Sequence, residues 1–289
     1  MPLQSSGQIS LNQIHVEAGG TSQTEAAIND ADIRGLIGAS SEASNLGFND
    51  FYGASSSASF VGSISRNHQD IQHIDSSSQA VDVVSAGVQV GDFVVIAICA
   101  DLWGGNNGNI TVSGMTMTVK TPYTYNADSG ATSGFVQTNI PAYVLAYGFW
   151  QSGNSNPYFV NGTGTSSTSV LRALSLGAAI FRNTNSSVLN LIASKGSSEN
   201  PNPASLSSVS GTKLIIAIAF LDDDEQTMGA PSGYTSVATA HTGSSTRDGV
   251  TGSCVAVAYK ITSTSTTEDP SSFNSNTYSD SWKCYTLRV

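Results

Sequence analysis

Two apolar segments of nearly the same sequence constrain the fold of this chain more than any other feature. Gly91–Ala100 has the sequence GDFVVIAICA, and Gly211–Phe220 has the sequence GTKLIIAIAF. A short apolar run rich in β-branched residues is typical of a buried β-strand. We therefore expect each segment to be a central strand, and their similarity indicates that a structural unit is repeated.

Further matches support a duplication. Four more pairs of segments agree in the same order along the chain: 113–116 with 232–235, 142–147 with 254–259, 157–161 with 270–274, and 176–182 with 282–288. The alternative is that any two halves of an all-β chain can be aligned loosely. Five matches in one order favour a duplicated β unit, with halves at about residues 60–183 and 184–289.

The composition favours a mainly β fold. Charged residues make up only 11% of the 289 residues, and clusters of Ser, Thr, Gly and Asn separate short apolar runs. Short strands, frequent turns and the lack of a long amphipathic helical pattern predict a β-sandwich, and two similar halves would give it a jelly-roll-like form. Cys99, Cys254 and Cys284 all fall in expected strands, where they are interpreted as small core residues and not as a disulfide framework or a zinc site.

Charge and hydropathy exclude two classes of partner. The chain carries 21 acidic and 11 basic residues, a net charge of −10, which argues against binding to the phosphates of a nucleic acid. No basic leader followed by an apolar segment opens the sequence, and no apolar run is long enough to cross a bilayer. We therefore expect neither membrane insertion nor a secretory address.

Residues 1–55 have short apolar segments separated by polar residues, unlike the long apolar runs of the rest, and are predicted to form a separate module. Three phrases, at 8–14, 26–33 and 45–52, each combine apolar residues with a polar turn whose Ser or Asn can cap a helical turn. A module so small and so sparsely apolar is expected to need a partner or a second copy. The candidate docking residues are Ile9, Leu11, Ile14, Phe48, Phe51 and Tyr52. The small polar stretch 54–59 predicts a flexible joint, so the sandwich would occupy residues 56–289.

These phrases resemble an N-terminal module of tailed-bacteriophage virion proteins, especially tail-fibre and tail-associated proteins of marine and cyanobacterial phages. The resemblance is carried by Met1–Ile14, Ile33–Gly38 and Phe48–Ser55, which follow the family phrases SGxISLxDI, VRxLxG and ISxxDFYGKS. This chain departs from the family where Leu46, Gly47 and Phe48 replace ISF, and where Ala54 replaces the usual Lys.

The body shows a second, more diffuse resemblance, to β-sandwich domains of phage structural proteins that are described as jelly-roll or carbohydrate-binding-like. It is carried by Gly91-Asp92, Ser113-Gly114, Ala146-Tyr147, Pro157, Ala258-Tyr259, Pro270, Trp282 and Leu287-Arg288. Together the resemblances imply a structural protein of the virion that docks on tail, baseplate or fibre proteins. They also imply self-association, because virion appendages are built from repeated copies.

Two candidate ligand sites stand out in the body. The run Asp222–Glu225 offers carboxylates for calcium, although calcium needs oxygens from more than one segment, and a solvated acidic loop is the alternative. Trp103, Tyr123 and Tyr125 lie in stretches rich in Gly, Asn and Thr, where aromatic rings can stack on sugars. They define an alternative function, a host-glycan-binding adhesin. A capsid decoration protein is a further alternative.

An enzyme is not expected. The sequence lacks a Gly-x-Ser-x-Gly nucleophile elbow and a phosphate-binding glycine loop. Its histidines, His15, His68, His73 and His241, do not follow metal-binding spacings. We therefore predict no catalytic residues, no cofactor and no bound metal.

Overall fold

The computed structural model describes residues 3–4, 6–37, 46–52, 58–69, 80–103, 110–124, 139–161, 170–184, 187–207, 213–221, 228–242, 253–262, 267–274 and 282–289. The chain divides into two compact units: residues 1–59 with 183–186, and residues 60–182 with 187–289. We refer to them as the N-terminal unit and the body.

The described part of the N-terminal unit has three short helices: α1 (Leu11–Glu17), α2 (Ala31–Gly35) and the 3-10 helix η1 (Phe48–Phe51). Ser10 begins α1 with a capping box, in which its hydroxyl accepts from the N–H of Gln13 (3.2 Å) and Gln13 Oε1 accepts from the N–H of Ser10 (2.8 Å). Asp50 Oδ2 likewise accepts from the N–H of Gly47, at 2.8 Å, where η1 begins. The predicted helical turns are therefore present, one in each phrase.

The N-terminal unit has its own small core. Ile9, Ile14, Ile33 and Phe51 are buried together, and partly buried apolar residues such as Leu11 and Leu36 pack around them. The three phrases thus bury their apolar residues against one another, and these core residues are covered within the chain itself.

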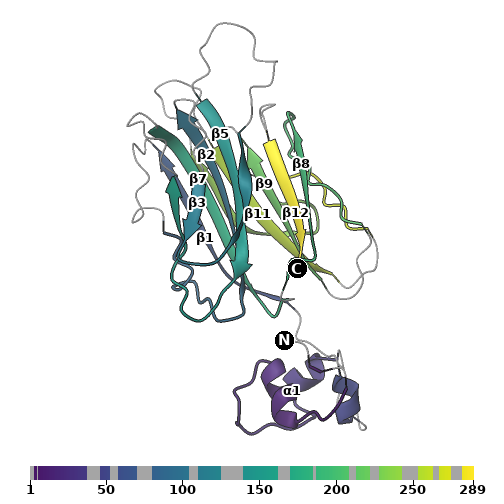
Figure 1. Cartoon of the computed structure of the whole chain (residues 1–289). Helices are drawn as coiled ribbons and strands as arrows, with labels where there is room; N and C mark the ends of the chain where they lie inside the picture. Colours follow the sequence, from purple (N-terminus) through teal and green to yellow (C-terminus); the bar gives the residue numbers. More distant parts are fainter. Residues whose placement is uncertain are drawn as a thin grey trace, which may run out of the picture. The chain divides into compact units, whose positions relative to one another are not determined.

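The first sheet of the body has the strand order β1-β7-β2-β5-β4 (Figure 1). The bounds are β1 (Ser59–Gln69), β2 (Phe93–Trp103), β4 (Thr118–Thr124), β5 (Asn139–Phe149) and β7 (Val170–Arg182). β2 pairs antiparallel with both β5 and β7, so the expected central position of the first apolar run is confirmed. β3 (Ile110–Ser113) and β6 (Tyr158–Asn161) form a separate antiparallel pair.

The second sheet has the order β10-β11-β9-β12-β8, and its described pairs are antiparallel. The bounds are β8 (Asn190–Gly196), β9 (Lys213–Leu221), β10 (Thr235–Thr242), β11 (Ser253–Thr262) and β12 (Trp282–Arg288). β9, which contains the second apolar run, lies at the centre between β11 and β12.

The two sheets are built on the same plan. When the β3–β6 pair is set aside, each sheet orders its strands as first, last, second, fourth and third along the chain. The aligned phrases also have equivalent geometry: Gly114 and Gly233 both adopt positive φ, at 89° and 77°. The aligned Asn161 and Asn274 pair with Ile110 and Gly229, which are aligned as well. The sheet plan thus agrees with the duplication that the sequence predicts.

The sheets pack face to face as a sandwich. β9 faces β2, and β10 and β11 face β7. Asn67 Nδ2 of β1 donates to the backbone oxygen of His241 of β10 (2.9 Å), which joins one edge of each sheet. The repeat equivalent of β1 is β8, which lies at the opposite edge of the second sheet from β10.

Each sheet comes from one half of the chain, because strands that are near in sequence usually become neighbours in space. The jelly-roll connectivity that the sequence suggested is therefore not confirmed, whereas the β-sandwich is. No helix among the described residues is both long and apolar enough to cross a membrane.

The central strands are buried on both faces. Cys99 of β2 reaches the second sheet, where its Sγ contacts the backbone oxygen of Leu221 at 3.5 Å. On the outer face of the first sheet, Val94, Ile96 and Ile98 pack under Val81, Val83, Met115, Trp150 and Phe159. A similar cover that includes Met228 and Phe273 lies over β9. Because neither face of β2 or β9 is exposed to water, both strands carry a continuous run of apolar residues.

Candidate functional site

The N-terminal unit is the first candidate site, because a hydrogen bond joins its third phrase to the residue that directly precedes its first phrase. The hydroxyl of Tyr52 donates a hydrogen bond to the backbone oxygen of Gly7. Gly7 has φ +96°, a conformation that favours glycine at this point of contact. The neighbour of Tyr52, Phe51, is buried with Ile9. The phrases are therefore parts of one folded unit.

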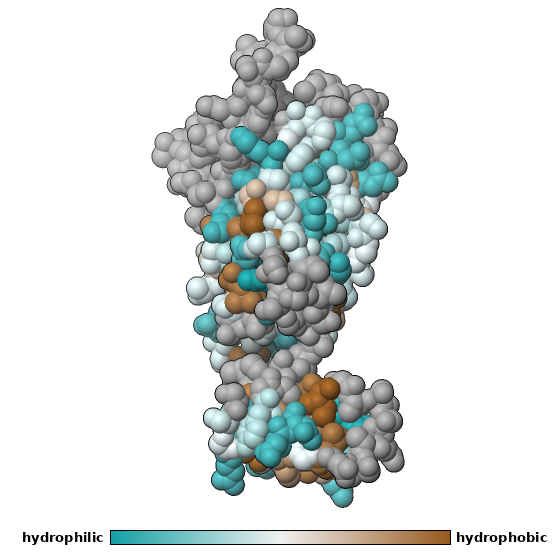
Figure 2. Space-filling model, turned by 90° about the vertical axis from the view of Figure 1, so that its right-hand side faces the viewer, coloured by the Kyte–Doolittle hydropathy of each residue, from teal (hydrophilic) through white to brown (hydrophobic). Residues whose placement is uncertain are grey.

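The structure separates the predicted docking residues into three groups. Ile9, Ile14 and Phe51 lie in the core of the unit and present no surface to a partner. Leu11 and Tyr52 are half-buried. Phe48 is 43% exposed, and Val16, which the sequence did not single out, is 44% exposed. Figure 2 shows apolar surface, in brown, on this unit. Sequence reasoning assigned to docking several residues that the unit uses for its own core, because an apolar phrase does not indicate which chain will cover it.

The N-terminal unit is also strongly acidic. Of the charged residues in the sequence, six acidic ones and a single basic one fall within residues 1–59: Glu17, Glu25, Asp30, Asp32, Glu42 and Asp50, against Arg34. Arg34 is engaged within the unit, since its Nη1 donates to the backbone oxygen of Asn29. A surface of this charge favours a partner with a positive surface.

The candidate sugar-binding aromatics are placed differently from the expectation. Trp103 is the last residue of β2 and Tyr123 lies in β4, so both are strand residues and not loop residues. β2 and β4 each pair antiparallel with β5, and therefore their ends meet at the same end of the first sheet. Tyr125 lies outside the described residues. The sequence missed these strand ends because polar residues such as Asp101 and Thr124 interrupt the apolar pattern there.

The candidate calcium run, Asp222–Glu225, lies outside the described residues, and Asp101 is placed in β2. Within the described parts of the chain, no three His, Cys, Asp or Glu residues gather in a way that could hold a metal ion. His73 is also outside these parts, and His241 is half-buried in β10. The three cysteines are buried, in agreement with their interpretation as core residues, and none of them is in a disulfide. Burial raises the pKa of the Cys284 thiol well above its ordinary value, which opposes the reactive thiolate form.

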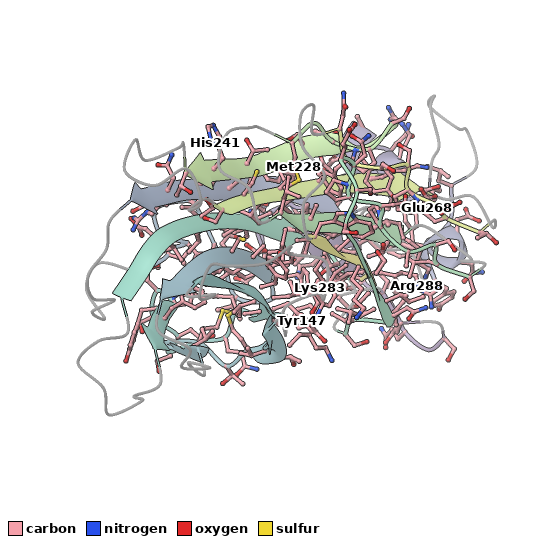
Figure 3. The ribbon with its side chains drawn as sticks, turned by 90° about the horizontal axis from the view of Figure 1, so that it is seen from above. Tyr147, Met228, His241, Glu268, Lys283 and Arg288 are labelled. Carbon is pink, nitrogen blue, oxygen red and sulfur yellow. The ribbon has the colours of Figure 1, made fainter. Side chains whose placement is uncertain are left out.

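Sequence reasoning missed two buried charge clusters. Asp92 is 2% exposed and pairs with Arg182, whose Nε and Nη2 donate to the two carboxylate oxygens at 2.9 and 2.8 Å. In the second cluster, the buried Glu268 accepts from Lys260 Nζ (2.9 and 3.1 Å) and from the hydroxyl of Tyr234 (3.0 Å). Burial, and then the charge of Glu268, raises the pKa of Tyr234. Figure 3 labels Glu268 beside the second sheet. The first cluster attaches the segment before β2 to Arg182 of β7, and the second attaches the segment that contains Glu268 to Lys260 of β11.

A third polar cluster lies between the sheets. The hydroxyl of Ser175 donates to the backbone oxygen of Ser253 at 2.7 Å, and Thr242 Oγ1 accepts from the N–H of Ser253 at 2.9 Å. All three side chains are buried, so their hydroxyl groups bond to one another and to the backbone. This arrangement joins β7 to β11. Ser175 and Ser253 therefore have a structural role that their sequence context did not indicate.

Comparison with protein-family models, with curated proteins and with solved structures finds no match for this chain. Function is therefore argued from the sequence phrases and from the geometry above.

Proposed function

We propose that this chain is a structural protein of a tailed-phage virion, and specifically a component associated with the tail or the tail fibre. In this proposal the N-terminal unit docks on a neighbouring virion protein and the β-sandwich is displayed or packed in an oligomer. The role is assembly, without a covalent step.

The observation that carries the proposal is the way in which the motif phrases fold together. Tyr52 of the third phrase donates a hydrogen bond to Gly7, which directly precedes the first phrase, and the core takes residues from all three phrases. A set of phrases that recurs in order in one class of virion proteins is here a single compact unit with its own caps and core. Such a unit can be attached to different bodies, as an adapter requires.

The docking surface must be made of residues that the unit leaves exposed. Phe48 and Val16 are its exposed large apolar side chains among the described residues. An exposed aromatic residue is a typical anchor in a partner's pocket, because it buries a large area at a small cost in side-chain entropy.

The test is incorporation into particles. Phage carrying the intact chain, a chain lacking residues 1–55, or the double variant Val16→Ser with Phe48→Ser would be purified, and the copies per particle counted. We expect few copies of the intact chain, located at the tail, and loss of both altered chains from the particle. The matched control replaces two exposed apolar residues of the body, Val84→Ser with Val90→Ser, and should be incorporated normally.

The other outcomes decide against parts of the proposal. Hundreds of copies spread over the head would replace it with the capsid decoration role. Absence of the intact chain from purified particles would reject a virion role altogether. Normal incorporation of the chain lacking residues 1–55 would reject the N-terminal unit as the docking element.

A second candidate function, a host-glycan adhesin, is favoured by one observation. Trp103 and Tyr123 come from separate strands that end at the same end of the first sheet. Replacing both with Ala, and Tyr125 with them, should abolish binding of particles to host cells if this end recognises glycan, while incorporation is unchanged. Unchanged binding to cells would reject the adhesin role.

A further inference from the structure

A histidine between the first two helices of the N-terminal unit is bonded in a way that depends on its protonation state. His15 lies in the last turn of α1, and its side chain is only 11% exposed. The ring rests against Gly20, where an added Cβ would lie 2.2 Å from His15 Cε1. The ring therefore has little freedom to turn away.

The hydrogen bonds of a threonine favour one tautomer of the neutral ring. Thr24 Oγ1 donates its single hydrogen to the backbone oxygen of Thr21 at 2.7 Å. The same oxygen lies 2.9 Å from His15 Nε2, and while its hydrogen is donated to Thr21 it can only accept from the ring, which assigns a hydrogen to Nε2. In a neutral imidazole the other nitrogen, Nδ1, then carries none.

That second nitrogen is the unusual feature of the site. Nδ1 is buried and has no hydrogen-bond partner, and it lies 4.0 Å from the Oδ2 atom of Asp32 on α2. A bare ring nitrogen cannot donate to a carboxylate, and a buried polar atom without a partner is costly. A protonated Nδ1 would instead present a donor and a positive charge to Asp32.

The other charged groups around the ring are few. The turn between Ala18 and Thr24 carries no charged side chain. Glu17 follows on α1, and Arg34 on α2 donates to the backbone oxygen of Asn29. On the remaining segments of the unit, Asp30 and Asp50 each accept from a nearby backbone N–H, and Glu25 is exposed. Asp32 is thus the carboxylate that the geometry assigns to Nδ1.

We propose that His15 is a proton-dependent latch between α1 and α2. The charged ring donates from Nε2 to Thr24 and from Nδ1 to Asp32, whereas the neutral ring leaves Nδ1 without a partner. The end of α1 adds to the effect, because a positive charge is favoured at a helix C-terminus. The stabilisation is present while the ring is protonated and is lost when the ring gives up its proton as the pH rises. The latch concerns the fold of the N-terminal unit and holds whether or not that unit docks in a virion.

The test uses the full-length chain with its histidines labelled with nitrogen-15. Nuclear magnetic resonance identifies the tautomer of His15 at high pH, and we expect hydrogen on Nε2. Hydrogen exchange, corrected for the intrinsic rates, then measures the opening of residues 11–37 at about pH 5.5, where histidine in a model peptide is charged, and at about pH 7.5, where it is neutral. We expect about two- to fivefold less opening at the lower pH, the size of effect that an exposed charge pair gives.

Two variants separate the latch from a general effect of pH. Asp32→Asn removes the carboxylate from a half-exposed side chain and should abolish the difference between the two pH values. Glu25→Gln removes an exposed carboxylate of the same unit and should preserve it. Hydrogen on Nδ1 in the neutral ring would overturn the proposal. So would a pH difference that persists in Asp32→Asn, or the lack of any difference in the unaltered chain.

Discussion

Single residues of the body show how this chain accommodates buried charge. Asp92 and Glu268 are both buried, and each has a cation and further donors around its carboxylate. A buried carboxylate without partners would be strongly destabilising, so each acidic residue is placed where its own repeat supplies a partner. Arg182 is the last residue of the strand next to β2, and Lys260 lies near the end of β11. The aligned position to Asp92 in the second repeat is Thr212, so the first cluster is not duplicated.

The half-buried Tyr234 and the buried Tyr285 of the second repeat predict a loss of stability in alkaline solution. Burial, and then the charge of Glu268, raises the pKa of Tyr234, and burial raises the pKa of Tyr285 to about 12. Because the folded state disfavours both tyrosinates, the stabilisation is present below the ordinary tyrosine pKa of ~10 and is lost as the pH rises above it.

Absorbance of tyrosinate and chemical unfolding, measured over the same alkaline range, check this prediction. We expect Tyr234 and Tyr285 to ionise only as the body unfolds. Tyr234→Phe should weaken the dependence of the unfolding free energy on pH. Ionisation of all tyrosines before unfolding would contradict the prediction.

At the scale of elements, the repeated Ser-Gly turn leads into the third strand of each sheet. Met115 and Tyr234 follow the two glycines and pack on the outer core of their own sheets. Positive φ at both glycines keeps the same turn in both repeats although the residues around it differ. The surroundings are unequal, however, since Gly114 lies close to the backbone of Asn156 and Gly233 faces open space.

This difference makes the two turns a matched pair for substitution. Gly233→Ala meets only the strain of a positive φ, which costs about 1 kcal/mol. Gly114→Ala meets the same strain and also brings a Cβ to 2.5 Å from the backbone oxygen of Asn156, which should add about 2 kcal/mol. Denaturant unfolding of the two variants measures both costs. Equal costs, or a larger cost at Gly233, would contradict the assigned environment of the turns.

At the scale of the whole molecule, the body is one sandwich made from two similar sheets, and neither sheet is complete alone. The face that β9 and β11 turn to the first sheet is fully buried and includes Ile216, Ile218, Phe220, Val255 and Val257. An isolated repeat would expose that face, whereas the N-terminal unit and the body each have a core of their own.

Fragments test this division. A chain that begins at residue 58 should unfold cooperatively with the midpoint of the body in the full-length chain. Residues 187–289 alone should fail to fold as a monomer, because the inner face of their sheet has no cover. Circular dichroism, denaturant titration and sedimentation measure the outcome for both fragments. A cooperative, monomeric fold of residues 187–289 would contradict the need for both sheets.

The sequence by itself determined the elements whose signal is local. Periodicity and β-branched composition predicted the central strands, and the order of matching phrases predicted the duplication. A Ser or Asn in each N-terminal phrase was expected to cap a helical turn, as Ser10 does. The burial of Cys99, Cys254 and Cys284 followed from the same strand pattern. These features depend on neighbours in sequence, which a single chain displays directly.

Only the tertiary structure decided which surfaces meet. An apolar side chain must be buried, but the segment that carries it does not specify which other segment or chain will cover it. Ile9, Ile14 and Phe51 are therefore core residues of the N-terminal unit and not docking residues, and each repeat forms its own sheet in place of a jelly-roll exchange of strands. The partners of Asp92, Glu268 and His15 were likewise hidden, because a hydrogen bond between distant segments leaves no local pattern in the sequence.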